Sequence, residues 1–236
     1  MTAEQKLIVA LDVSSMAEAE KFVKLLSPVV KTFKVGKELF TSVGAPVIQM
    51  IHSHGGRVFL DLKFHDIPNT VGAACEAATR LNVFMLNVHA SGGKQMLFQA
   101  VKSVTETANA LKITPPLVIG VTVLTSLKDE DLKDIGIRAK VESQVELLAK
   151  LSKSCGLDGV VASAHEIQAI RNATDDKFLI VTPGVRPVWA AHGDQKRVMT
   201  PREAIDKGAN FIVVGRPITQ SEDPKKAAEK ILKEIS

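Results

Sequence analysis

Short apolar runs recur along the chain, and a segment with helical periodicity follows each of them. Continuous apolar runs of this length are typical of parallel strands that are buried on both faces. We expect such strands at residues 7–13, 33–36, 58–63, 83–89, 117–124, 159–163, 178–184 and 211–216. Eight alternating strand and helix units predict an α/β protein, a (β/α)₈ TIM barrel in which residues 1–236 form a single domain. An open doubly wound sheet is the alternative, although such sheets usually have fewer repeats.

Apolar stripes and capping residues predict the helices between these strands. Ser14 or Ser15 is expected to cap the helix after the first strand. After the third strand, Pro68 should end the strand, and Asn69 or Thr70 should cap the next helix. Further helices are expected through residues 43–51, 71–81, 96–111, 141–155, 166–171 and 224–235.

Polar side chains stand where the predicted strands end. These residues are Asp12, Lys34, Asp61, Lys63, Thr125, Ser126 and Arg216. In a barrel of this type the carboxyl ends of all strands converge on one mouth, and barrel enzymes do their chemistry there. The pattern therefore predicts a single active site built from several strands.

The third strand carries the most informative of these residues. Asp61 and Lys63 are two positions apart, so on a strand they point to the same side. Burying charges costs on the order of several kcal/mol per ion unless the charges are paired. A structural ion pair explains Asp-x-Lys alone about equally well. The nearby Asp66 and the abrupt Ile67-Pro-Asn-Thr70 turn favour a functional site.

A phosphate site is predicted on the opposite side of the mouth. Barrels of this type commonly hold phosphate with the loops after strands seven and eight. Arg186 lies in the first of these loops, and Gly215 with Arg216 begins the second. An isolated arginine is usually a surface ion-pair partner, but two arginines in the two expected loops favour phosphate binding. The loop at 184–200 is long enough to be a lid, and its Trp189 and His192 are assigned no chemical role.

Composition excludes several classes of protein. A net charge of +4, from 30 basic and 26 acidic residues, with 4% aromatic residues and no Tyr, does not indicate a nucleic-acid-binding protein. No apolar run is long enough to cross a membrane, and the N-terminal residues carry no secretion signal, so we expect a cytoplasmic protein. Cys75 and Cys155 are expected to be packed free thiols. No His, Cys or carboxylate set has the spacing of a metal site.

Residues 61–70, Asp-Leu-Lys-Phe-His-Asp-Ile-Pro-Asn-Thr, resemble the signature of the orotidine 5'-phosphate decarboxylase family. The match is specific because it covers ten consecutive residues. The shorter Asp-x-Lys-x-x-Asp pattern is shared with related barrels, including the metal-dependent keto-gulonate phosphate decarboxylases. Other matching segments follow in the family's order, namely 11–12, 34–36, 123–126, 182–187, 193–197 and 214–217.

This resemblance implies a cofactor-independent decarboxylation of orotidine 5'-phosphate to UMP and CO₂, the last step of de novo UMP synthesis. It implies that Lys63 stabilises and protonates the carbanion at C6, within a charge network built by Asp61 and Lys34. It also implies a homodimer in which Asp66 and Thr70 reach into the neighbouring subunit's site.

The remaining contacts implied by the resemblance hold the substrate. Asp12 and Lys34 would bind the ribose hydroxyls, and Thr125 and Ser126 would contact the pyrimidine. The phosphate would be held by Arg186, Gln195, Gly215 and Arg216. No cofactor and no metal are implied.

Two alternatives remain open. A metal-dependent sugar-phosphate decarboxylase or epimerase on the same barrel needs an acidic metal ligand at the end of the second strand, where this chain has Lys34. A non-catalytic barrel that binds a phosphorylated ligand explains Arg186 and Arg216. It leaves Asp61, Lys63 and Asp66 without a purpose.

Overall fold

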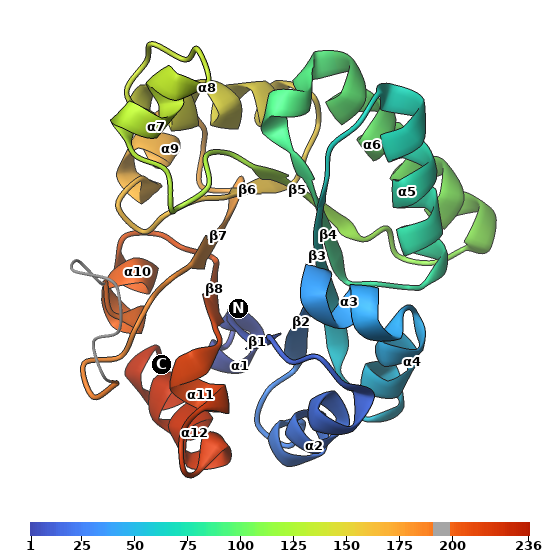
Figure 1. Ribbon diagram of the computed structural model, residues 1–236, viewed down its shortest axis with the longest axis vertical. Coiled ribbons are helices and arrows are strands. Elements are labelled where there is room, and N and C mark those ends of the chain that lie inside the picture. The colour runs from blue at the N-terminus through green and yellow to red at the C-terminus, as the bar shows by residue number, and fades with distance from the viewer. Residues whose placement is uncertain (191–198) are drawn as a thin grey trace.

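The computed structural model describes residues 1–190 and 199–236, and in these residues eight parallel strands close into a barrel. Each strand pairs with its neighbours in sequence, and β8 pairs with β1 to complete the closure. The strands are β1 Leu7–Leu11, β2 Thr32–Gly36, β3 Arg57–Phe64, β4 Met85–His89, β5 Leu117–Val121, β6 Gly159–Val161, β7 Leu179–Pro183 and β8 Phe211–Val214. Figure 1 looks into the barrel and shows the helices as an outer ring. The predicted (β/α)₈ fold is confirmed.

Helices connect the strands on the outside of the barrel. They are α1 Ala3–Lys6, α2 Met16–Leu26, α3 Lys37–Val43, α4 Pro46–Ser53, α5 Pro68–Arg80, α6 Gly93–Leu111, α7 Asp129–Asp134, α8 Val141–Ser154, α9 Ile167–Ala173, α10 Pro201–Asp206, α11 Arg216–Thr219 and α12 Pro224–Glu234, with a 3₁₀ turn at Ala90–Gly92. Ser15 caps α2 as expected, because its side chain accepts a hydrogen bond from the backbone N–H of Glu18. The apolar runs therefore predict the strand order, although several strands are shorter than the runs.

Two helix predictions are wrong in detail. The single helix expected through residues 43–51 is two helices, because Gly44 adopts a φ of 72° between α3 and α4 and Pro46 begins the second one. Asn69 and Thr70 do not cap α5. That helix begins at Pro68 with Ile67 as its N-cap residue, so both polar residues lie in its first turn.

Side chains of alternate strand positions fill the interior of the barrel. The interior cluster contains Ile8, Ala10, Phe59, Met85, Ile119, Val181, Phe211 and Val213, all buried. The other strand positions face outward and pack beneath the helices in a larger cluster. Because the interior is packed, it leaves no room for a ligand, and the active sites of such barrels lie at the carboxyl ends of the strands.

The two cysteines are buried free thiols, as expected. Burial raises the pKa of the Cys75 thiol to about 12, so this side chain behaves as a small apolar group at neutral pH. In the described parts of the chain, none of the helices combines the length and apolar character needed to cross a membrane.

Candidate active site

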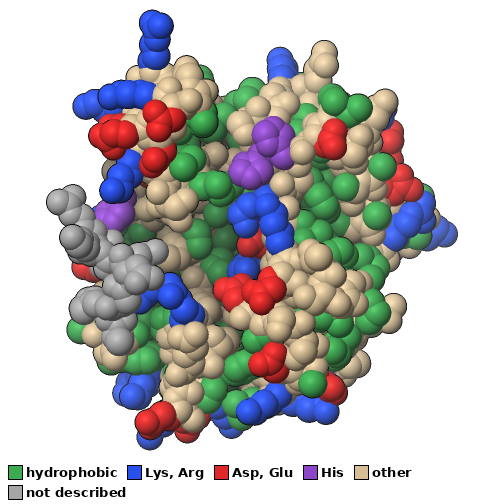
Figure 2. All heavy atoms as spheres, viewed as in Figure 1, with side chains coloured by type: hydrophobic (Ala, Val, Ile, Leu, Met, Phe, Trp, Pro, Cys, Tyr) green, Lys and Arg blue, Asp and Glu red, His purple; other side chains and the backbone are tan. Residues whose placement is uncertain are grey.

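A row of four alternating charges crosses the mouth of the barrel. Lys63 Nζ lies 2.6 Å from Asp61 Oδ1, and Lys34 Nζ lies 3.4 Å from Asp61 Oδ2. Lys34 Nζ also lies 3.0 Å from Asp12 Oδ1. We call Asp12, Lys34, Asp61 and Lys63 the charge row; Asp12 directly follows β1, Lys34 lies on β2, and Asp61 and Lys63 lie on β3. Figure 2 shows basic, acidic and histidine side chains around the hollow at the centre of this face.

One end of the charge row is exposed to solvent, and the other three side chains are largely buried. The Asp12 side chain is 58% exposed, whereas the side chains of Asp61 and Lys34 are each only 12% exposed and that of Lys63 is 24% exposed. Asp61 is thus a mostly buried carboxylate with an ammonium group at each oxygen. Because the water that would screen these charges is largely excluded, their mutual attraction is stronger than at the surface.

The backbone of β3 is irregular at Lys63. This residue has a φ of 54°, in the left-handed region that side chains other than glycine seldom adopt. The register with β4 also shifts here, since Leu60 is opposite Leu86 but Phe64 is opposite Val88. Asp61 and Lys63 do meet on one side, as expected, and Leu62 packs against the outer cluster. The strand alternation alone would not have predicted the bulge that brings them together.

Asn87 on β4 contacts both residues. Its amide nitrogen donates to Asp61 Oδ1 at 2.7 Å, and its Oδ1 accepts a hydrogen bond from the backbone N–H of Lys63 at 2.8 Å. Asn87 is fully buried. The sequence signal for Asn87 is an amide inside the apolar run 83–88, and the predicted site residues do not include it.

Two adjoining hollows are each lined by part of the charge row. The inner one, of about 210 Å³, is lined by Lys34, Asp61, Lys63 and Thr125 together with apolar side chains. The outer one, of about 180 Å³, is lined by Asp12, Lys34, Arg186, Gly215 and Arg216, among others. Lys34, Pro183 and Val213 line both, so the two hollows can hold the two ends of one ligand.

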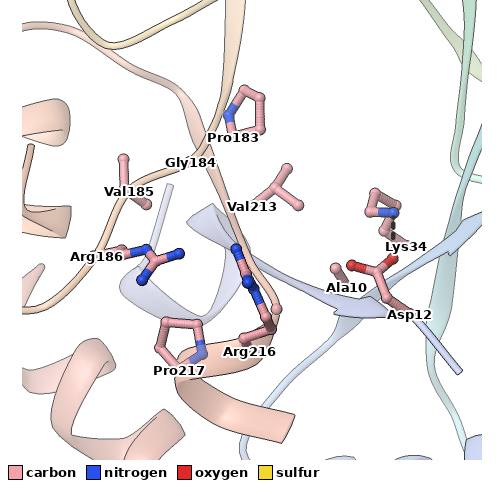
Figure 3. A pocket seen from close by; sticks show the side chains of 11 residues that line it. Ala10, Asp12, Lys34, Pro183, Gly184, Val185, Arg186, Val213, Arg216 and Pro217 are labelled. Carbon is pink, nitrogen blue, oxygen red and sulfur yellow. Dashed lines mark hydrogen bonds and ion pairs between the residues drawn. The ribbon is translucent and has the colours of Figure 1, made fainter. Parts of the chain in front are cut away.

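The outer hollow is basic on one side and carries the Asp12–Lys34 pair on the other. Figure 3 shows Arg186 and Arg216 entering from the β7 and β8 side, and Asp12 with Lys34 across from them. A Cβ atom at Gly215 would lie 3.3 Å from Asp12 Oδ2, so glycine lets the chain pass close to this carboxylate. The arrangement suits an anion held by two guanidinium groups.

The other predicted site residues are more exposed than the charge row and make fewer contacts with it. Ser126 lies in an exposed turn next to Thr125. Asp66 and Thr70 are exposed, and Asp66 Oδ1 accepts a hydrogen bond from the backbone N–H of Ile67 at 2.6 Å. Within residues 1–190 and 199–236, no ion pair joins Asp66 to Lys63 or to another cation. Among the described residues, Asp61 is therefore the acid that this chain pairs with Lys63.

The loop prediction falls partly outside the described residues. Gln195 and His192 both lie in the segment 191–198, which is outside them. Trp189 is described and is 44% exposed, with Lys230 Nζ 5.4 Å from the centroid of its ring.

A histidine pair borders the inner side of the mouth. The rings of His65 and His89 have centroids 5.3 Å apart. Burial, aided by the nearby charges of His65, Lys37 and Lys63, lowers the pKa of His89 to about 4. His89 is therefore neutral at physiological pH and adds no charge to the charge row.

The family model for the orotidine 5'-phosphate decarboxylase / HUMPS family matches residues 5–231. The chain belongs to this family. A protein named orotidine 5'-phosphate decarboxylase from Moorella thermoacetica is 55% identical over 236 residues, covering 100% of this chain and 94% of the relative. A protein of the same name from Syntrophotalea carbinolica is 54% identical over 234 residues, covering 99% of this chain and 96% of the relative.

Solved structures with a similar fold include one that carries the family's name. The crystal structure of orotidine 5'-phosphate decarboxylase from Lactobacillus acidophilus superposes with a TM-score of 0.87 at 38% identity, covering 98% of this chain and 99% of that one. An uncharacterized conserved protein from Geobacillus kaustophilus superposes with a TM-score of 0.86 at 34% identity, covering 98% of this chain and 100% of that one. The family's fold thus extends over nearly the whole chain.

His89 and Glu166 should give the stability of the protein opposite pH dependences. The unfolded chain protonates His89 near pH 6.5 and the folded chain only near pH 4, so His89 costs stability as the pH falls between these values. Burial raises the pKa of Glu166 from 4.5 to about 7, so Glu166 costs stability as the pH rises through that interval. Urea unfolding from pH 4 to 7.5 should show that His89→Gln removes the acid-side loss and Glu166→Gln the neutral-side loss. Parallel curves for both variants and the unaltered protein would contradict these assignments.

Proposed function

We propose that this protein decarboxylates orotidine 5'-phosphate to UMP and CO₂ without a cofactor, as the last step of de novo UMP synthesis. The observation that carries the proposal is the contact of 2.6 Å between the Lys63 ammonium and the Asp61 carboxylate in the mouth of the barrel. Relatives that are 55% and 54% identical over the whole chain and carry the name of this activity support it.

The chemistry requires a fixed positive charge at C6 of the pyrimidine. When the bond from C6 to the carboxylate breaks, the electron pair stays on C6 in the plane of the ring, where no adjacent group can delocalise it. In the proposed mechanism the Lys63 ammonium stabilises this carbanion and then transfers a proton from Nζ to C6. Water then returns a proton to the amine. The products are UMP and CO₂, and no electron acceptor is needed.

Asp61 and Lys34 keep the ammonium in place before the substrate arrives. Asp61 Oδ1 holds Lys63, and Asp61 Oδ2 faces Lys34. A carboxylate beside Lys63 stabilises its charged form, which is the proton donor and is not a nucleophile. A Schiff-base mechanism through Lys63 is therefore disfavoured, and preorganised electrostatics is the catalytic device we propose.

In the proposed complex, each of the two hollows binds one end of the substrate. We assign the pyrimidine to the inner hollow, with Thr125 and Ser126 as its polar contacts, and the ribose hydroxyls to Asp12 and Lys34. We assign the phosphate to the outer hollow, with Arg186, Gln195, Gly215 and Arg216 as its ligands. Phosphate contacts far from C6 would then contribute binding energy to the closing of the site.

We further propose that the active unit is a homodimer. Asp66, Ile67 and Thr70 are exposed at the start of α5, and the Ile67 side chain is 66% exposed. Their exposure leaves these side chains available to a second subunit. In this arrangement Asp66 and Thr70 complete the partner's site, which would give Lys63 the second acid that its own chain does not supply.

The two alternatives explain less of the site. A metal-dependent sugar-phosphate enzyme needs an acidic ligand where Lys34 stands, and the Lys34 ammonium occupies the space beside Asp61 Oδ2 instead. A binding protein without activity accounts for Arg186 and Arg216 but not for the charge row.

Replacing Lys63 should abolish turnover and spare product binding. In Lys63→Ala, kcat should fall by at least about 10³-fold because the proton donor and the main electrostatic contact are lost. The affinity for UMP should change by less than about tenfold, since the product carries no developing charge at C6. The loss of absorbance of orotidine 5'-phosphate measures turnover, and calorimetry measures UMP binding. Lys24→Ala, which removes an exposed lysine paired with Glu20, is the control and should be fully active. Near-normal turnover of Lys63→Ala would exclude this mechanism.

Replacing Arg216 should weaken phosphorylated ligands selectively. Hydrogen bonds to charged groups contribute roughly 1.5–3 kcal/mol, so Arg216→Ala should weaken UMP binding by roughly 10- to 100-fold and leave uridine binding nearly unchanged. Arg202→Ala, at an exposed arginine paired with Asp206 on α10, serves as the control. Equal losses for UMP and uridine would remove Arg216 from the phosphate site.

Mixing two inactive variants should restore activity if Asp66 acts in the partner's site. Lys63→Ala and Asp66→Ala should each be inactive as homodimers. After unfolding and refolding together, half of the dimers are hybrids with one intact site, so about a quarter of normal activity should return. Lys63→Ala mixed with Asp61→Ala is the matched control, because both changes affect residues of the same chain's site and no hybrid has an intact one. No recovery in the first mixture would place Asp66 outside the shared site.

A further inference from the structure

The strand ladder is interrupted where the charge row meets β4. Leu60 of β3 is opposite Leu86 of β4, and Phe64 is opposite Val88. Residues 61–63 of β3 therefore face Asn87 alone, because it is the only residue between 86 and 88. Three residues against one cannot form a regular ladder, so the backbone N–H groups of this bulge need other partners.

The side chain of Asn87 provides one of these partners. Its Oδ1 accepts the backbone N–H of Lys63 at 2.8 Å, replacing the strand carbonyl that a regular ladder would supply. This contact is made while Lys63 is in the left-handed region at a φ of 54°. The left-handed conformation costs a residue other than glycine roughly 1–2 kcal/mol. Lys63 therefore keeps this conformation only because contacts such as this hydrogen bond stabilise it.

The other end of the same amide fixes Asp61. Asn87 Nδ2 donates to Asp61 Oδ1 at 2.7 Å, and the Lys63 ammonium contacts the same oxygen at 2.6 Å. One amide thus binds the backbone of Lys63 and also the carboxylate that its side chain contacts. The oxygen and the nitrogen of the Asn87 amide thus each form a hydrogen bond, and the residue is fully buried.

We propose that Asn87 is a positioning residue for the reaction: it holds the bulge of β3 so that the Lys63 ammonium points at Asp61 Oδ1. This inference rests on the proposed decarboxylase function. The role demands an amide, because only an amide offers a donor to Asp61 and an acceptor to Lys63 at this length. Leucine is similar in size and has neither group, and aspartate keeps the acceptor but has a donor only when protonated.

Asn87→Leu should lower kcat by roughly 10- to 100-fold with little change in KM, because a displacement of about 1 Å at the reacting group has an effect of this size. Asn87 lines neither hollow, so substrate binding is spared. A crystal structure of the variant should show that Lys63 has left its positive φ or that its ammonium has moved away from Asp61. Unchanged Lys63 geometry with unchanged kcat would overturn the proposal.

Asn87→Asp gives a readout that a purely structural role would not change. At low pH the new carboxyl is protonated and can still donate to Asp61, whereas at higher pH two carboxylates face each other and the donor is lost. The activity of the variant relative to the unaltered enzyme should therefore be highest at about pH 5 and fall as the pH rises, as the shared proton is lost. A ratio that does not change with pH would contradict the assignment.

The groups around this position allow the pH profile to be interpreted. Lys34 lies on β2, Asp61 and Lys63 lie on β3, and His89 follows on β4. On β5 the residue paired with Asn87 is Ile119, which does not titrate. Taking the ratio of variant to unaltered enzyme cancels the titration of the substrate and of groups that the substitution does not affect.

Thr32→Val is the matched control for lost stability. Thr32 is fully buried on β2 at the other end of the barrel, where its hydroxyl accepts a hydrogen bond from Arg57 at 3.0 Å. This variant also removes a buried polar contact, but its kcat and pH profile should match those of the unaltered enzyme. If the unaltered enzyme itself shows no turnover, the proposed function fails, and the structure of Asn87→Leu still decides whether Asn87 holds the bulge.

Discussion

The structure of the site depends on one mostly buried carboxylate between two ammonium groups. Asp61 has Lys63 at one oxygen and Lys34 at the other, with only 12% of its side chain exposed. Burying a single unpaired charge at this position would cost free energy of folding. Removing Lys34 or Lys63 would leave the Asp61 carboxylate without one of its partners where little water reaches it. The three groups are therefore stable only as a set, and a set of this kind keeps its geometry when water leaves the mouth. That property is what a reaction that creates an anion requires.

The closure of the barrel makes this set possible. Lys34 and Asp61 lie on adjacent strands, and Asp12 lies just beyond β1, which is also the strand that closes the barrel against β8. Parallel pairing brings the carboxyl ends of β1, β2 and β3 to one rim, and the same closure brings Arg216 to this rim, across the outer hollow from Asp12. Residues that are about 200 positions apart in the chain thereby line a single hollow, so the fold supplies the geometry and the strand ends supply the chemistry.

The fold and most of the charge row were predictable because the signals are local. An apolar run that ends in Asp12 or in Asp61-Leu-Lys63 already gives both the strand and the direction of its last side chains. The break at Gly44 and the start of α5 at Pro68 were missed because they depend on backbone angles and capping. Asn87 was missed for a different reason. Its role depends on the register between β3 and β4, and no single strand contains that information.

The irregular backbone of β3 shows how the site reconciles packing with chemistry. A regular strand would place Lys63 two positions above Asp61 on the same face, about 7 Å further along the strand. The bulge reduces the distance along the strand between Asp61 and Lys63, so the Lys63 ammonium contacts Asp61. Leu62 still packs outward, against the outer cluster. The left-handed conformation at Lys63 costs stability, and the buried amide of Asn87 offsets part of that cost through the backbone N–H it binds. Strain in the strand and the hydrogen bonds that compensate for it therefore lie beside the side chain proposed to move the proton.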